Sequence, residues 1–437
     1  MAAFANPLDV VRDRGFVQDV TDAEGLRRLF EIERVTFYSG FDPSAPSLHT
    51  GHLVPIMLMA WLQRLGQRPI VLLGGATGRI GDPSGRDAER SLLPDEVIAE
   101  NLTRQRAQLT RLLDLSHPDR GVLVDNHDWL GGLALLDFLR DVGKHFSVNQ
   151  MLARESVRRR LEQREQGISY TEFSYQLLQA YDFAHLYASE GCRLQIGGSD
   201  QWGNILSGVE LTRRLEGADV YGLTTSLLLD AEGRKFGKSV GRPTWLDPSL
   251  TSPYAYYQFW INTHDDDVVR FLRLFTFLPE QEIHELARIH GNDPGARVAH
   301  RRLAEECTRL VHGEQGLAEA QRATRVLFGG EPFGELDDQV VVEAFEAAPS
   351  VELSRGRLER GIGVLELLLE AGAAPSVSEA RRLVRQGGIY LNNIRVDDEH
   401  RVVDVDDLAS PTTLVLRVGK KRYFLVRFPG LGSQALI

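Results

Sequence analysis

The stretch Tyr38-Ser-Gly-Phe-Asp-Pro-Ser-Ala-Pro-Ser-Leu-His-Thr-Gly-His52 decides how the rest of the chain is interpreted. It begins in a β-branched and aromatic run that predicts a strand, and it precedes an apolar run, Leu53 to Leu65, that predicts a helix. Its prolines and Gly40 break regular structure between the two. His49 and His52 therefore lie at a helix start, where unpaired backbone N–H groups and the helix dipole favour an anion. We predict a phosphate or nucleotide site here. Half of a zinc site and two polar loop residues are the alternatives, and the sequence offers no Cys/His cluster to complete a zinc site.

Composition describes a globular protein with several domains. The 437 residues are 43% hydrophobic and 25% charged, which suits a large core and about two to four domains. The net charge of −11 means that any nucleic-acid contact must rest on local basic patches, which counts against a protein that coats DNA or RNA. We find neither a signal-peptide pattern nor an apolar stretch long enough to cross a bilayer, and expect no membrane partner. Cys192 and Cys307 are the only cysteines, and we expect a cytoplasmic protein.

Strands alternate with helices over the N-terminal half. The apolar runs 69–73 and 122–125 predict buried strands, and a helix over 94–113 lies between them. This alternation predicts an α/β domain with a mostly parallel sheet, whose ligands bind at the carboxyl ends of the strands. A glycine-rich loop over 74–86 follows the first of these strands, and Asp82 would be its charged acceptor facing a ligand. A plain strand–helix turn is the alternative.

A helix over 172–187 carries polar residues among apolar ones. Tyr175, Gln179 and Asp182 are spaced at i, i+4 and i+7, so they share one face. A polar set on a helix that is otherwise rich in Leu and Phe predicts a buried polar pocket. An ordinary amphipathic surface helix is the alternative.

Two further loops carry candidate ligand contacts. A strand over 193–196 runs into two glycines followed by Asp200, which can accept hydrogen bonds from both ribose hydroxyls while Gly198 leaves room for the sugar. Glycines also surround Lys235 and Lys238, which predicts a mobile loop that brings positive charge to a polyphosphate. Two solubilising surface lysines are the alternative for this second loop.

The pattern changes near Pro248. Residues 249–327 show helical periodicity, 328–361 are rich in Gly, Glu and Asp and predict a linker, and 362–437 predict helices with short strands. The predicted boundaries are therefore 1–248, 249–327, 328–361 and 362–437. Basic side chains on one helix face and one turn of the last segment are candidate RNA contacts: Arg381, Arg382, Arg385, Lys420 and Lys421.

Together these segments resemble the bacterial-type tyrosyl-tRNA synthetases, class I enzymes with a C-terminal S4-like RNA-binding domain, over essentially the whole chain. Residues 43–52 are similar to the HIGH motif of class I synthetases, and Lys235-Phe-Gly-Lys238-Ser239 resembles the KMSKS motif. The segments Gly197-Gly-Ser-Asp-Gln-Trp-Gly-Asn204 and Leu178-Gln-Ala-Tyr-Asp182 are equally characteristic. The resemblance implies a Rossmann-like catalytic domain, an all-helical domain and a small α+β domain. It also implies the formation of tyrosyl-adenylate from L-tyrosine and ATP, followed by transfer to tRNA(Tyr).

The resemblance further implies roles for individual residues. Tyr38 and Asp182 would hydrogen-bond the substrate phenol, so that phenylalanine would leave polar groups unpaired. The other tyrosine contacts would be Asp82, Tyr175 and Gln179 at the ammonium group, and Gln195 and Gln201 near the carboxylate. The ATP contacts would be Gly40, Asp42, His49, His52, Gly198, Asp200 and Lys238. The pyrophosphate leaving group would be stabilised by His49, His52, Lys235, Lys238 and Ser239.

Cofactors and partners follow from the same resemblance. We expect Mg²⁺ to arrive with ATP, no protein-bound metal or prosthetic group, and a homodimer. Ser39, Pro55 and Arg86 stand where the family often has other residues, which bears on fine tuning. The alternatives are a tryptophan-specific enzyme, a non-catalytic RNA-binding relative, and another nucleotidyl transferase. Tyr38 together with Asp182 argues against a tryptophan-specific enzyme. The intact histidine and lysine motifs argue against a non-catalytic relative, and the helical and S4-like segments argue against another nucleotidyl transferase.

Overall fold

The computed structural model describes residues 5–84, 92–162, 167–228, 236, 238–239, 242–329, 331, 333, 336–419 and 422–429. They form two compact units, which are described separately below. The first unit joins Met1–Asp247 to Phe259–Val311, and the second joins Pro248–Gln258 to His312–Ile437. Among the described residues, no helix combines the length and apolar character that crossing a bilayer requires.

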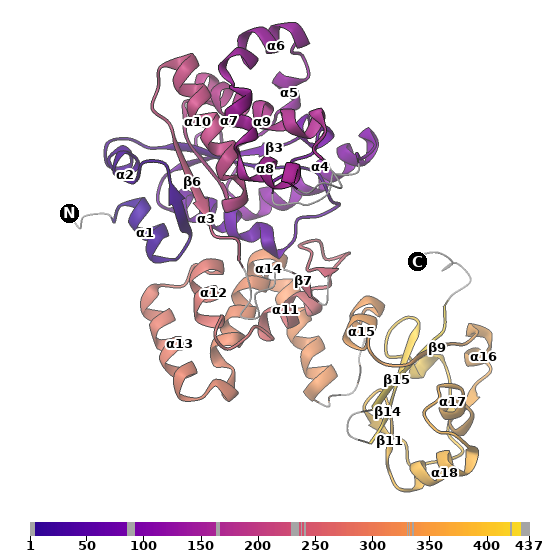
Figure 1. The fold of residues 1–437 in the computed structure, drawn as a ribbon. Coiled ribbons are helices and arrows are strands. Elements are labelled where there is room, and N and C mark those ends of the chain that lie inside the picture. The colour runs from indigo at the N-terminus through magenta and orange to yellow at the C-terminus, as the bar shows by residue number, and fades with distance from the viewer. Residues whose placement is uncertain are drawn as a thin grey trace. The chain divides into compact units, whose positions relative to one another are not determined.

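The first unit is built on a six-stranded sheet in the order β1-β6-β5-β2-β3-β4. Figure 1 labels its strands β3 and β6. Its strands are β1 Val17–Val20, β2 Thr36–Phe41, β3 Arg68–Leu73, β4 Val122–Asp125, β5 Cys192–Gly198 and β6 Tyr221–Thr225. Strands β2 to β6 pair in parallel, and β1 pairs antiparallel with β6 at one edge. The predicted α/β fold with a mostly parallel sheet is confirmed. From β2 the chain proceeds outward to β3 and β4, and from β5 it proceeds the other way to β6. The carboxyl ends of β2 and β5 are therefore the switch point, where open α/β sheets bind ligands.

Helices cover this sheet. They are α1 Pro7–Asp13, α2 Ala23–Ile32, η1 Thr50–His52, α3 Leu53–Arg64, η2 Thr77–Arg79, α4 Asp95–Leu112, α5 His127–Leu130, α6 Leu135–Asp141, η3 Gly143–His145, α7 Val148–Leu152, α8 Glu155–Glu162, α9 Tyr170–Glu190, η4 Ser199–Gln201 and α10 Trp202–Glu216. Helix α3 is apolar almost throughout and is correspondingly buried. Helix α9 begins where the Ser169 side chain accepts from the Glu172 N–H, and it ends at Gly191, whose φ of 65° suits glycine. Helices α9 and α10 pack together beside β5.

The segment before Glu33 has Leu26, Leu29, Phe30 and Ile32 at helical spacing, which predicts helix, but it also contains a strand. Strand β1 lies between α1 and α2, and its Val17 pairs with Thr225 of β6. A strand of four residues that contains Asp19 has little apolar periodicity of its own. It forms because β6, distant in sequence, offers a sheet edge.

Helices alone occupy the described residues between 249 and 327, as the periodicity predicts. They are α11 Pro253–Ile261, α12 Val268–Phe275, α13 Glu280–Asn292, η5 Pro294–Ala296 and α14 Val298–Gly329. Gly313 interrupts α14 with φ 72° and ψ −176°, a conformation that glycine adopts most readily. The compact units divide close to this point, within the segment that the sequence assigns to one helical domain.

The second unit holds a five-stranded sheet in the order β12-β11-β14-β15-β9. Its elements after α14 are α15 Asp338–Ala344, β9 Ser350–Glu352, α16 Arg355–Glu359, β10 Ile362–Gly363, α17 Val364–Glu370, α18 Val377–Arg385, β11 Ile389–Leu391, β12 Ile394–Arg395, β13 Val402–Val403, η6 Val405–Asp407, β14 Thr413–Val418 and β15 Arg422–Arg427. Strand β9 pairs in parallel with β15, although it lies in the segment 328–361 that the sequence predicts as a linker. One apolar core joins α17 and α18 to the inner residues of β11, β14 and β15.

Candidate active site

A buried carboxylate and a buried phenol stand at the switch point. Tyr38 on β2 and Asp182 on α9 are each 1% exposed, and the Tyr38 ring meets the edge of Phe183 at 5.3 Å between centroids. Burial raises the pKa of Asp182 to about 7, against the hydrogen bonds that this carboxylate accepts. Burial and the nearby Asp182 charge also hold the pKa of Tyr38 well above its usual range. The Tyr38 hydroxyl has no hydrogen-bond partner among the described residues. This pair can therefore provide hydrogen-bond partners for a polar ligand group among apolar side chains.

Two side chains orient the Asp182 carboxylate, and neither is among the site residues predicted from the sequence. Asn126 donates to one carboxylate oxygen at 3.0 Å, and Trp129 donates its indole N–H to the other at 2.8 Å. Both follow β4, so the carboxyl end of a third strand contributes to the site. In the sequence, Asn126 is a polar residue directly after a predicted strand, and this position could have marked it as a candidate site residue. Trp129 offered none, because only the fold turns its ring toward α9.

A network of amide side chains surrounds Asp82. Gln201 donates to one oxygen of Asp82 at 2.7 Å, and the Ser84 N–H donates to the other at 2.9 Å. Gln179 donates to Gln201 at 3.2 Å, and Asn204 donates to Gln179 at 2.9 Å. The structure thus brings together Asp82, Gln179 and Gln201 from three separate segments. These neutral donors leave the charge of the carboxylate in place, which suits a cationic ligand group.

Asn204 belongs to a quoted motif but had no assigned role. It is 7% exposed, and its amide reaches Asp82 at 3.5 Å, Ser84 at 3.3 Å and Gln201 at 3.3 Å as well as Gln179. It therefore sets the orientation of both glutamines. No sequence signal separates it from other polar residues at a helix start.

Asp42 links the opening stretch to α9. Tyr175 donates its hydroxyl to one oxygen of Asp42 at 2.8 Å, and Thr77 donates to the other at 2.7 Å. A Cβ on Gly74 would lie 2.0 Å from this carboxylate, and a Cβ on Gly75 would lie 2.2 Å from that of Asp125. The glycines at the end of β3 therefore leave room for two carboxylates of the protein itself. From the sequence alone, such glycines predict the close approach of a ligand.

The two histidines of the opening stretch are held by the backbone at the start of η1. The Gly51 N–H donates to Nδ1 of His49 at 3.0 Å, and the His49 N–H donates to Nδ1 of His52 at 3.1 Å. A ring nitrogen that accepts a hydrogen bond carries no proton, so each neutral ring has its proton on Nε2. The rings lie 4.0 Å apart, and a phosphate oxygen accepts from such N–H groups. Because the Nδ1 lone pair of each ring already accepts a hydrogen bond, neither Nδ1 can bind a zinc ion in this arrangement.

Other predicted residues line the same edge of the sheet. Gln195 on β5 is in register with Tyr38, is 3% exposed, and its side-chain oxygen has no partner among the described residues. Gly198 ends β5, and a Cβ there would lie 2.5 Å from the Asp200 carboxylate. Gly40 is exposed on β2. Asp200, in η4, is half-buried.

Some predicted residues are only partly described. Lys235, Lys420 and Lys421 lie outside the described residues. Lys238 and Ser239 are described by backbone alone, in β7 (Lys238–Ser239), which pairs with β8 (Arg242–Pro243). In the second unit, Arg385 donates to both oxygens of Glu399 at 2.8 and 3.1 Å, Arg381 lies 3.4 Å from the same residue, and Arg382 lies 2.6 Å from Glu379.

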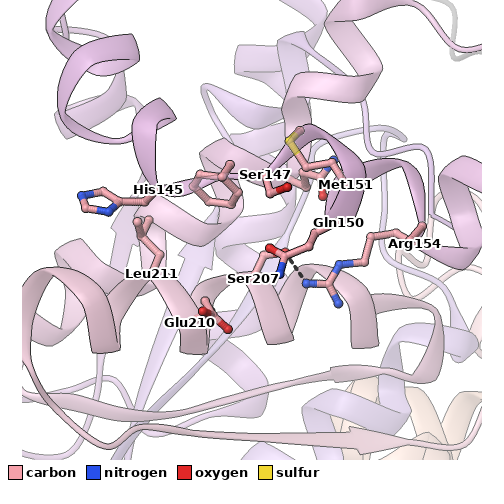
Figure 2. Close-up of a pocket in the computed structure, with 11 residues that line it drawn as sticks. His145, Ser147, Gln150, Met151, Arg154, Ser207, Glu210 and Leu211 are labelled. Atoms are coloured by element: carbon pink, nitrogen blue, oxygen red, sulfur yellow. Dashed lines mark hydrogen bonds between the residues drawn. The ribbon is translucent and has the colours of Figure 1, made fainter.

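A separate cavity of about 260 Å³ lies between α7, α9 and α10 (Figure 2). Arg154 extends across this cavity and donates to Ser207 of α10 at 3.2 Å. Glu210 lies on the same helix as Ser207. None of the residues predicted for the site lines this cavity. Helix α7 contributes Gln150 and Met151 to it.

Comparisons with known proteins agree over nearly the whole chain. The family described as tRNA synthetases class I (W and Y) matches residues 31–329, and that described as the tyrosine–tRNA ligase SYY-like C-terminal domain matches residues 341–426. The tyrosine–tRNA ligase of Roseiflexus castenholzii is 50% identical over 96% of this chain and 99% of its own length. That of Geobacillus stearothermophilus is 48% identical over 95% of this chain and 98% of its own length.

Solved structures agree in fold. A C-terminally truncated mitochondrial tyrosyl-tRNA synthetase of Aspergillus nidulans is similar with a TM-score of 0.67 at 36% identity, over 74% of this chain and 94% of that one. A tryptophanyl-tRNA synthetase of Encephalitozoon cuniculi is similar with a TM-score of 0.54 at 14% identity, over 79% of this chain and 95% of that one, which reflects a shared fold.

Proposed function

The chain belongs to the tyrosine–tRNA ligase family of class I tRNA synthetases, and we propose that it activates L-tyrosine with ATP and transfers the tyrosyl group to tRNA(Tyr). The family that the sequence resembles is thereby confirmed. The buried pair of Tyr38 and Asp182 is the observation that supports tyrosine as the substrate. It offers hydrogen-bond partners to the phenol hydroxyl of the substrate among apolar side chains. The alternatives of a tryptophan-specific enzyme and a non-catalytic relative are not favoured.

The first reaction is an in-line displacement. An oxygen of the tyrosine carboxylate attacks the α-phosphorus of ATP, the bond to the β-phosphate oxygen breaks, and pyrophosphate leaves with the electron pair. The carboxylate is already ionised, so no general base is required. Catalysis rests on positioning and on charge stabilisation. In the second reaction a hydroxyl of the terminal adenosine of tRNA attacks the tyrosyl carbonyl carbon, and AMP leaves.

The residue roles are part of this proposal. The phenol end of tyrosine binds Tyr38 and Asp182, and its ammonium group binds at Asp82, where amide donors preserve the negative charge. Gln195 and Gln201 serve the carboxylate. The Nε2–H groups of His49 and His52 donate to phosphate oxygens. Tyr175 and Gln179 join Asp82 at the ammonium group. Further ATP and leaving-group contacts come from Gly40, Asp42, Gly198, Asp200, Lys235, Lys238 and Ser239.

The direct test is exchange of pyrophosphate into ATP across the aromatic amino acids. We expect L-tyrosine to support exchange with saturating Mg-ATP, and phenylalanine and tryptophan to leave the rate at background. Equal exchange with tryptophan, or none with tyrosine, contradicts the proposed substrate. Omitting Mg²⁺ tests whether the ion arrives with ATP: activity should follow the Mg-ATP concentration.

We further propose that the chain acts as a homodimer. Large apolar side chains are exposed on α6 and α7, with Leu135 at 70%, Leu136 at 78% and Val148 at 59% exposure. A surface of this kind suits burial against a second copy. Sedimentation should give a dimer, and Leu136→Glu should shift it to monomer. A monomeric parent chain contradicts this proposal.

The location and the domain division also remain proposals. The free, buried Cys192 and Cys307 suit the reducing cytoplasm. The boundaries at 248, 327 and 361 can be tested by limited proteolysis, which should cut first within 328–361. The match of residues 341–426 supports RNA binding by the C-terminal segment, through Arg381, Arg382, Arg385, Lys420 and Lys421. A chain that ends at residue 329 should retain exchange and lose tRNA charging.

A further inference from the structure

Three potential metal ligands converge in the helical part of the first unit, apart from every residue assigned above. Asp265 lies in the loop between α11 and α12, His290 in the last turn of α13, and His300 in the first turn of α14. One ligand atom from each residue lies within 4.8 Å of the other two. The three positions are far enough apart in the sequence that no metal-binding spacing is visible there.

The two imidazoles are poorly satisfied by the protein. His300 is fully buried, and neither of its ring nitrogens has an aligned hydrogen-bond partner among the described residues. Its Nε2 lies 3.1 Å from an oxygen of Asp265, and the ring also approaches the Thr263 backbone, in both cases without that alignment. Nδ1 of His290 is also buried without a partner among the described residues, while Nε2 lies 3.1 Å from the Asp265 carbonyl oxygen. Buried polar atoms in this condition cost free energy unless something else binds them.

Charge and geometry are compatible with a bound cation. The Asp265 side chain is 50% exposed and supplies a negative charge. Arg297 approaches that carboxylate only to 4.0 Å and donates instead to the backbone oxygens of Ile261 and Thr263.

We propose that Asp265, His290 and His300 bind one divalent transition-metal ion, zinc before the others, with water as the fourth ligand. Ligand atoms around a tetrahedral zinc ion lie about 3.3 Å apart, which the separation between His300 and Asp265 already meets. To bring the His290 ring nitrogen to the same separation from the other two ligand atoms, its side chain must move by about 1–2 Å. Two imidazoles and a carboxylate match the ligand preferences of zinc. The resemblance to the synthetases implies no protein-bound metal, and no ligand spacing in the sequence points to these three residues.

Such an ion would stabilise the helical part of the unit. It would join the α11–α12 loop to α13 and α14, three segments that apolar packing, the Arg297 contacts and the ion pair between Arg302 and Glu282 also hold together. The ion is assigned no step in the reaction, so its loss should lower the melting temperature and leave the chemistry of tyrosine activation in place. This inference is independent of the proposed substrate.

The test is zinc titration of the full-length chain after removal of metal with a chelator. We expect one zinc ion per chain by calorimetry, at micromolar or lower Kd, and a higher Tm with zinc than with the chelator. Asp265→Asn and His290→Gln should each weaken this binding by about tenfold or more. Cobalt(II) in place of zinc should give visible absorption bands that both variants lose.

A neighbouring histidine is the matched control. His264 is exposed, lies next in sequence to Asp265, and contacts Asp266 at 3.4 Å instead of the cluster. His264→Gln should bind zinc like the parent chain. The proposal is overturned if the parent binds no zinc, if Asp265→Asn and His290→Gln bind as tightly as the parent, or if His264→Gln loses binding equally. Tyrosine-dependent exchange measured without added zinc establishes that each variant is folded.

Discussion

The carboxylates of Asp82 and Glu399 are satisfied in opposite ways. Asp82 is 6% exposed at the switch point and accepts from the amides of Gln201 and Asn204 and from a backbone N–H. Glu399 in the second unit has a side chain that is 16% exposed, and it accepts from the exposed Arg385, with Arg381 beside it. Neutral donors orient a carboxylate and preserve its charge, whereas arginines neutralise it.

The difference indicates what each region can bind. The buried network holds a negative charge in place for a cationic group, and its geometry is set before the ligand arrives. The surface ion pairs are worth little individually, so a phosphate can replace Glu399 as the partner of an arginine at small cost. We therefore expect changes in the first region to affect tyrosine activation strongly, and changes in the second to affect tRNA affinity mildly.

The largest effect is expected from Asp82→Asn. It removes the charge while retaining the size of the side chain, and loss of a charged hydrogen bond of roughly 2–3 kcal/mol corresponds to about 100-fold in kcat/KM for tyrosine. The measurement is pyrophosphate exchange at varied tyrosine concentration. Glu399→Gln is the matched control and should leave exchange unchanged. Similar losses in the two variants would remove the contrast between the regions.

The next effect is a pH dependence of tyrosine binding. The raised pKa of Asp182, about 7, means that its carboxylate becomes mostly charged between pH 6 and pH 8. A charged acceptor binds a phenol O–H more strongly, so tyrosine affinity without ATP should rise by up to about tenfold over that interval. Asp182→Asn should abolish the rise, and a rise that persists would show that another group titrates.

The same pKa has a consequence for stability. Because the folded pKa lies above the ordinary value of 3.8, the unfolded chain loses this proton first as pH rises. Burial of Asp182 therefore costs no stability at low pH, and the cost grows as pH rises from about 4 through 7. Urea unfolding at pH 5 and pH 8 should show a smaller loss of stability with pH in Asp182→Asn than in the parent chain.

A smaller effect is expected from Asn204→Ala. It leaves Asp82 in place and removes the amide that orients Gln179 and Gln201, so a loss of about 1 kcal/mol, or roughly fivefold in kcat/KM, should result. Glu216→Ala, at the exposed end of the same helix, is the control. If the two variants behave alike, the network is not what orients the glutamines.

The smallest effect is expected from Arg385→Gln. Loss of one phosphate contact should weaken tRNA binding by about two- to threefold and reduce its salt dependence, with exchange unaltered. Arg357, which is paired with Glu366 and Glu370 outside α18, provides the control Arg357→Gln. An equal change in both variants would argue for general electrostatics instead of a binding face.

The histidine motif and the glycine loop show what could and what could not be predicted from the sequence. His49 and His52 were predicted at a helix start, and the structure places them there because local signals suffice for that position. The role of Gly74 could not be predicted, because the carboxylate that fills the space beside it belongs to Asp42, which follows the neighbouring strand β2. The same applies to Trp129, whose partner Asp182 is on α9.

By itself, the sequence determined the alternation of strands and helices, the helix face shared by Tyr175, Gln179 and Asp182, and the family. Periodicity, helix capping and glycine placement are local, so they can be interpreted without the fold. Only the tertiary structure decided that β1 pairs with β6, that Asn126 and Trp129 hold Asp182, and that Asp265, His290 and His300 meet. These contacts join residues that are distant in the chain, and burial, which sets their energies, arises only when the segments pack together.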